Sequence, residues 1–216
     1  MSQFFTLLRK EILLEFRQRY AIGGILLYVV STVFVVYLSF QQVKPPVWNA
    51  LFWIISLFAA VNAVAKSFMQ ESGKRQLYYY SLASPIAIIY SKIFYNTLLL
   101  SILAVLTYAT MSVLVSNPIV EPSLFWLTML LSSVGFSITF TFISAIAAKA
   151  NNSGTLMAVL SFPVILPILL ELIRLTIISI GFAKDSSWYK DVLILTAIDF
   201  ILLSMVYILF PFLWKE

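Results

Sequence analysis

The chain has 216 residues, of which 62% are hydrophobic and 11% are charged, and its mean hydropathy is +0.99. Soluble domains carry about a quarter charged residues, so the composition excludes a water-soluble globular protein and predicts an all-α integral membrane protein. The formal net charge is +5, but the cations gather in short connections, as membrane insertion requires, so nucleic acid is not an expected partner.

Residues 1–20 are too charged to span a membrane, and they predict an amphipathic interfacial helix. Apolar side chains recur every four residues from Phe4 to Phe16, and four basic side chains are available to the other face. Such a helix lies in the membrane surface, with its cations near anionic lipid headgroups. Two alternatives stay open, a disordered basic tail that only fixes orientation and, less favoured, a cleaved signal peptide.

Residues 21–216 predict a domain of six transmembrane helices. A helix needs about 20 apolar residues to cross a bilayer, and six apolar stretches of this kind follow one another. They cover about 21–40, 47–65, 86–115, 124–148, 155–182 and 191–213. In the second stretch, Trp48 and Trp53 are expected to lie at the outer membrane interface as aromatic anchors.

The basic residues indicate the orientation of these helices. With six crossings, ten of the fourteen cations fall on one side of the membrane and three on the other, and Arg174 lies within a span. The ten are Arg9, Lys10, Arg17, Arg19, Lys66, Lys74, Arg75, Lys92, Lys149 and Lys215. Cytoplasmic loops carry the excess of Lys and Arg, so both termini and residues 66–85 are predicted to be cytoplasmic.

Residues 66–85 form the longest polar interruption in the chain and are the first candidate site. Glu71, Lys74 and Arg75 surround Gly73, and Leu77 and a run of three tyrosines follow. Plain connections are usually shorter than this, which favours a segment that couples the membrane domain to a cytosolic partner. The alternative is a solvated loop that serves only topology. Ser84 and Pro85 predict the start of the next helix, because proline suits a first helical turn.

The fifth stretch holds the second candidate site. Pro163 and Pro167 each remove a helical hydrogen bond, which predicts a kink or a break. Glu171 and Arg174 are three residues apart and can pair on one face. The pair is either an intramembrane functional pair or an anchor at the outer interface, where the break lets the chain turn back. In the second case, residues 175–182 would be a re-entrant or surface segment.

The remaining polar residues give little sign of catalysis. Asn62, Asn96 and Asp199 are expected to form hydrogen bonds between helices. Without histidine or cysteine, the chain lacks the usual ligands for zinc and haem, and neither a catalytic residue nor a metal site is predicted. The glycine spacing contains no GxxxxGK, so the chain is not its own ATPase. A proton-coupled secondary carrier that uses Glu171 and Asp199 stays open.

Three segments resemble a known family. They are FRQRYAIGGILLYVV at the first span, FMQESGKRQLYYYSLASPIAIIYSK around the cytoplasmic segment, and LSFPVILPILLE in the fifth span. Together they are similar to the haem exporter protein B (CcmB) family, which consists of ABC-2 type transporter membrane subunits of cytochrome c maturation. The family pattern of an acidic residue, glycine, leucine and proline matches Glu71, Gly73, Leu77 and Pro85. The acidic residue that often follows the glycine is replaced by Gln76.

The resemblance implies a non-catalytic permease subunit in the bacterial inner membrane, with residues 66–85 seated in a cleft of a cytosolic CcmA-like ATP-binding subunit. Two copies of each subunit would form the transporter core. Further partners would be a CcmC-like haem-handling membrane subunit and a CcmE-like periplasmic haem chaperone. ATP would bind to the partner, and the complex would handle haem, so no cofactor is expected on this chain. The alternative within the same fold is the permease of another ABC-2 exporter.

Overall fold

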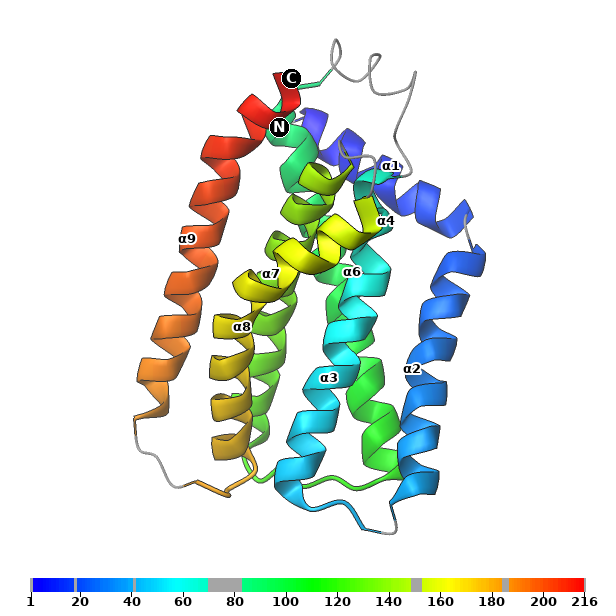
Figure 1. The fold of residues 1–216 in the computed structure, drawn as a ribbon, viewed down its shortest axis with the longest axis vertical. Helices are drawn as coiled ribbons and strands as arrows, with labels where there is room; N and C mark the ends of the chain where they lie inside the picture. Colours follow the sequence, from blue (N-terminus) through cyan, green and yellow to red (C-terminus); the bar gives the residue numbers. More distant parts are fainter. Residues whose placement is uncertain are drawn as a thin grey trace.

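The computed structural model describes residues 2–17, 19–40, 42–69, 83–148, 153–183 and 187–215, and these contain helices and connections without a strand. The helices pack side by side into one bundle (Figure 1). They are α1 (Ser2–Arg17), α2 (Arg19–Ser39), α3 (Pro45–Val64), α4 (Lys66–Met69), α6 (Pro85–Leu114), α7 (Pro122–Ala147), α8 (Ser153–Ser179) and α9 (Trp188–Lys215).

Within the described residues, five helices are long and apolar enough to cross a membrane. These are α3, α6, α7, most of α8 and most of α9, and their bounds lie close to the predicted spans. The apolar part of α2 is shorter, Gly23–Ser39. The all-α fold is therefore confirmed, and five of the predicted spans are helices long and apolar enough to cross a membrane. A sixth crossing by α2 stays a prediction.

Both chain ends lie at the same end of the bundle (Figure 1). We call this end, which also holds α4, the terminal end, and we call the opposite end the far end. Helix α1 lies across the terminal end, at a steep angle to the helices that span the bundle, and it packs mainly on α6. Its Phe5 and Leu13 stay exposed. An apolar face left uncovered on a helix across the bundle end is what an interfacial helix requires.

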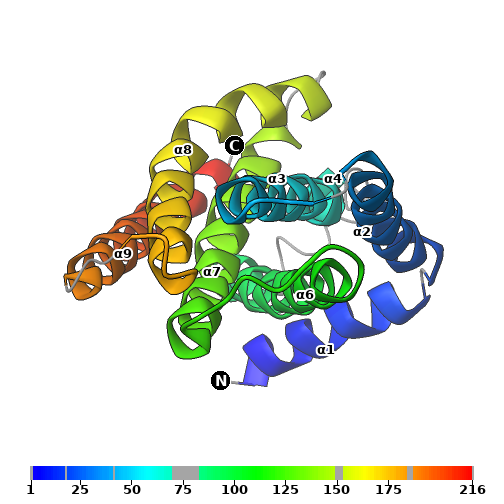
Figure 2. The same cartoon turned by 90° about the horizontal axis from the view of Figure 1, so that it is seen from below.

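Helix α7 is the central helix of the bundle. It separates α8 and α9 from α3 and α6 (Figure 2), and it is the most buried of the five spans. Many of its buried residues are serine or threonine, and several of their hydroxyls donate to carbonyls of the same helix. Thr128 donates to Leu124 O at 2.8 Å and Ser133 to Met129 O at 2.9 Å. Thr128 and Ser133 therefore enter the core with their donors satisfied, whereas Thr139 Oγ1 has no hydrogen-bond partner among the described residues.

Trp48 and Trp53 lie in the core near the far end, so the prediction that they are interface anchors is wrong. Both are almost fully buried. The ring of Trp48 stacks on Phe52 with centroids 5.3 Å apart, and Phe125 packs against Phe52 at 5.4 Å. Tryptophan has the same amphipathic ring in a core as at an interface, and the neighbouring helices decide which of the two it occupies.

Helix α8 is continuous through Pro163 and Pro167, which lie inside it. The helix changes direction along its length (Figure 1), so the prolines bend the helix and the expected break does not occur. Leu175 and Ile178 are buried within the same helix. Residues 175–179 are therefore the last turns of α8, and the expectation of a re-entrant or surface segment there is wrong.

Candidate functional site

The centre of the predicted coupling segment, with Glu71, Gly73, Lys74, Arg75 and Leu77, lies outside the described residues. The structure describes its two flanks, α4 on one side and the start of α6 on the other. Helix α6 begins at Pro85, and the Ser84 side chain accepts a hydrogen bond from Ala87 N at 3.3 Å. The predicted start of the third span is thus confirmed, with serine as its N-cap.

Lys92 lies about two turns into α6 and joins three helices. Its side chain is almost completely buried, and the residue is 1% exposed. The ammonium donates to Ser67 O of α4 at 2.8 Å and to Glu11 Oε2 of α1 at 3.2 Å. It also lies 4.9 Å from the centroid of the Phe68 ring. One cation therefore holds α1, α4 and α6 together directly beside the first flank of the segment.

This arrangement compensates the charge of a buried cation. An ammonium taken out of water costs several kcal/mol unless an opposite charge and further acceptors replace the lost hydration. Glu11 supplies the charge, with Oε1 3.2 Å from Lys92 Nζ, while Ser67 supplies a carbonyl and Phe68 an aromatic face. Lys10 also lies 3.3 Å from Glu11, but its side chain is more exposed. Lys92 is therefore the buried partner of this carboxylate.

A second set of polar contacts fastens α4 to α6 and α7. Asn96 Nδ2 donates to Thr141 Oγ1 at 2.8 Å and to Ser67 Oγ at 3.3 Å. Ser144 Oγ accepts from Phe68 N at 3.4 Å and donates to Ala65 O at 3.2 Å. The expectation that Asn96 bonds between helices is confirmed. The first flank is thus held on two sides by side chains from deeper in the bundle.

Sequence reasoning missed the Glu11–Lys92 contact. The two residues are 81 positions apart, and Lys92 entered the prediction only as one more cytoplasmic cation. The prediction for Asn62 is also wrong, because its side chain is exposed on α3. The Glu11–Lys92 contact and the exposure of Asn62 both depend on which face of a helix packs against a neighbour. In a helix that is apolar all round, the spacing of apolar residues in the sequence does not indicate which face is buried.

At the far end, α3 is tied to α8 and to the turn before α7. Trp53 Nε1 donates to Thr176 Oγ1 at 3.0 Å and Asn49 Nδ2 to Ile173 O at 3.0 Å. Trp48 Nε1 donates to Ser116 O at 2.9 Å. Because α3 leads directly into α4 at its other end, one helix connects these far-end contacts with the flank of the coupling segment.

Glu171 and Arg174 form the predicted i,i+3 pair, with a distance of 3.8 Å between Oε1 and Nη1. The Arg174 side chain is 65% exposed, whereas that of Glu171 is largely covered. Helix α8 ends at Ser179, so Arg174 lies within about two turns of the far end. An exposed cation near a helix end favours the interface anchor, since long basic side chains there reach toward the headgroups.

Replacing Arg174 with glutamine is therefore expected to change the unfolding free energy by less than about 0.5 kcal/mol, the usual size of an exposed helical ion pair. Thermal unfolding of the purified protein in detergent measures this effect. A loss of several degrees in Tm would contradict the interface assignment and would favour an internal pair.

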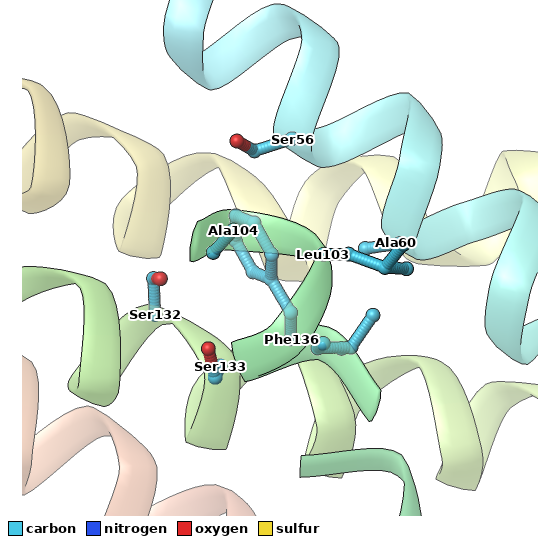
Figure 3. Close-up of a pocket in the computed structure, with 8 residues that line it drawn as sticks. Ser56, Ala60, Leu103, Ala104, Ser132, Ser133 and Phe136 are labelled. Carbon is cyan, nitrogen blue, oxygen red and sulfur yellow. The ribbon is translucent and has the colours of Figure 1, made fainter. Parts of the chain in front are cut away.

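A small cavity lies between α3, α6 and α7 (Figure 3). Its volume of about 10 Å³ suits a single water molecule and is far too small for a porphyrin. The Ser56 hydroxyl, which has no hydrogen-bond partner among the described residues, belongs to its lining. The lining residues are Ser56, Ala60, Leu100, Leu103, Ala104, Ser132, Ser133 and Phe136.

Comparison with known proteins gives one family. The family model described as CcmB protein matches residues 2–212, almost the whole chain. No curated protein matches the chain. The match covers α1, the described flanks of residues 66–85 and the apolar helices in a single family.

Proposed function

The chain belongs to the CcmB protein family, and on that basis we propose that it is the membrane permease subunit of an ABC transporter complex for cytochrome c biogenesis. In this role it couples ATP hydrolysis by a partner ATPase to haem delivery or to release of the haem-loaded periplasmic chaperone. The family match and the multi-pass arrangement of apolar helices support the proposal. The subunit itself is non-catalytic.

The contacts of Lys92 are the observation that carries the coupling role. A force applied to residues 66–85 reaches α4 at one end of the segment and the start of α6 at the other. From α4 it passes to α6 and α1 through Lys92, to α7 through Ser144, and to α3 through the chain itself. Helix α3 then carries it to the far-end contacts with α8. Packed helices transmit such displacements as rigid bodies.

The partners in this proposal follow from the family. A CcmA-like ATP-binding subunit holds residues 66–85 in a cleft, and two copies of each subunit form the transporter core. A CcmC-like membrane subunit and a CcmE-like periplasmic chaperone handle haem. Six crossings place both termini in the cytoplasm of a bacterium and the protein in its inner membrane. The basic residues near the terminal end and the family match support this orientation.

Charge reversal in the segment tests the coupling role. Glu71→Lys, and separately the double change Lys74→Glu with Arg75→Glu, are expected to reduce stimulation of the partner ATPase at least tenfold, because they place like charges against the cleft. Membrane insertion and Tm should not change. ATP turnover by the reconstituted complex is the measurement.

Lys44→Glu is the matched control, because it reverses an exposed charge in the turn before α3 at the far end. It should leave ATPase stimulation unchanged. Normal stimulation in both segment variants would remove the coupling assignment, and equal losses in all three would show a general effect of charge.

Co-purification in mild detergent separates the alternatives. A P-loop ATPase that arrives together with cytochrome c maturation proteins supports the full proposal. An ATPase with unrelated partners supports the permease of another ABC-2 exporter. This chain alone, under conditions that preserve other complexes, would favour the proton-coupled carrier.

A further inference from the structure

Asp199 lies at mid-length in α9, the helix at one edge of the bundle (Figure 2). At about 1.5 Å per residue it is roughly 16 Å from Trp188, close to half of the ~30 Å hydrocarbon thickness. The residue is only 6% exposed. Its carboxyl group is thus enclosed by protein at the depth where water is scarcest.

Gly135 of α7 leaves the space that this carboxyl group fills. A Cβ atom at position 135 would lie 2.6 Å from Asp199 Oδ1 and 3.5 Å from Ile168 Cδ1. The first distance is shorter than non-bonded atoms tolerate, so a Cβ atom at position 135 would require the Asp199 side chain to shift. Among the described residues, neither Oδ1 nor Oδ2 has a hydrogen-bond partner. The group is therefore closely packed and unpaired.

An ionised carboxylate is strongly disfavoured in such surroundings. Helix α7 contains no ionisable residue, and Arg174 of α8 is exposed and paired with Glu171. The other ionisable side chains on helices packed against α9, or on α9 itself, are Tyr90, Lys92, Tyr95, Tyr108, Tyr189, Lys190, Asp191, Tyr207 and Lys215. The described residues give Asp199 no hydrogen bond or ion pair with any of them.

Metal cations need several oxygen ligands, and the described residues contain no group of three or more acidic side chains that could hold one. A proton needs only the carboxyl group itself. We propose that Asp199 is a proton-binding site, at which a neutral carboxylic acid is held between α7, α8 and α9. Proton binding and the packing of α9 on α7 then stabilise each other.

The pH dependence of stability tests the site in the full-length protein. Asp199→Asn keeps the shape and is always neutral. The unfolded chain releases the aspartate proton above about pH 4, while the folded protein keeps it. As the pH rises above about 4, the folding equilibrium constant of the wild type should therefore fall about tenfold per pH unit relative to that of Asp199→Asn. This fall should stop at the pH at which Asp199 ionises in the folded protein.

Asp191→Asn is the matched control, because it makes the same change in the first turn of the same helix. Its stability should follow the wild type across the pH range. A constant difference between wild type and Asp199→Asn over the whole range would overturn the proposal.

Infrared spectroscopy gives a second readout, which detects the protonated carboxyl group directly. Carboxyl-isotope-labelled aspartate marks only three side chains, at positions 185, 191 and 199. The wild type at neutral pH should show an isotope-shifted carbonyl stretch of a protonated carboxylic acid. The absence of this band would overturn the proposal. If the wild type and Asp191→Asn both show this band and Asp199→Asn lacks it, the protonated carboxyl group is that of Asp199.

Discussion

Replacing Lys92 with methionine is expected to lower the unfolding free energy by about 3 kcal/mol, because removal of one partner leaves the other charge of a buried pair uncompensated. Among the described residues, Glu11 keeps Lys10, which is more exposed, and Ser67 O loses the ammonium at 2.8 Å. Methionine fills most of the same volume, so the loss reports the charge and its hydrogen bonds. Thermal or denaturant unfolding in detergent measures it.

Lys10→Met is the matched control, because Lys10 contacts the same carboxylate at 3.3 Å from a more exposed position. Its expected effect is within about 1 kcal/mol. Equal losses for the two methionine variants would show that burial of Lys92 contributes nothing to stability.

A double variant separates stability from coupling. Combining Lys92→Met with Glu11→Leu removes both charges, and apolar replacement of a buried pair is often neutral or stabilising. Tm should therefore recover toward the wild type. ATPase stimulation should be lower than in the wild type in both the single Lys92→Met and the double variant, because α1 and α4 no longer share the ammonium. Recovery of both would show that packing alone connects these helices.

Trp48→Ala is expected to destabilise the protein by about 3–5 kcal/mol, the usual range for truncating a large buried aromatic side chain. The change removes the stack on Phe52 and the hydrogen bond to Ser116 O. It also opens a cavity where α3, α7 and the turn before α7 meet. The loss of Tm in detergent is the measurement.

Trp126→Ala is the matched control for Trp48→Ala. Trp126 lies in the first turns of α7, near the same end of the bundle, but it is exposed. Its truncation should therefore cost far less. Similar losses for both tryptophans would restore the interface-anchor interpretation of Trp48.

The sequence predicted the helices well because length and hydropathy decide them. The third span, predicted as 86–115, is Pro85–Leu114, and the fourth, predicted as 124–148, is Pro122–Ala147. A proline in the first helical turn marks where each of these helices begins, and polar connections separate them from their neighbours in the sequence. Pro163 and Pro167 predicted a kink or a break in α8, and the structure shows a bend in a continuous helix. The sequence did not decide between the two, because neighbouring helices determine whether a proline-containing helix continues.

The contacts between helices were harder to predict. Asn96 was expected to bond across helices and does, since a buried amide in a membrane helix needs a partner. The roles of Glu11, Lys92 and Asp199 depend on which helix faces them, and no sequence spacing contains that information. The core positions of Trp48 and Trp53 depend in the same way on α7 and α8.

The serine- and threonine-rich centre of α7 bears on how the chain is made. Helices α8 and α9, which cover much of α7, are synthesised after it, so α7 enters the bilayer before these neighbours exist. Thr128 and Ser133 donate to carbonyls of their own helix, so these two hydroxyls need no neighbouring helix while α7 is surrounded by lipid. Ser137, which donates to Ile93 O of α6 at 2.7 Å, can bond at once to a helix already inserted. These three hydroxyls of α7 therefore need no partner from the helices that are made later.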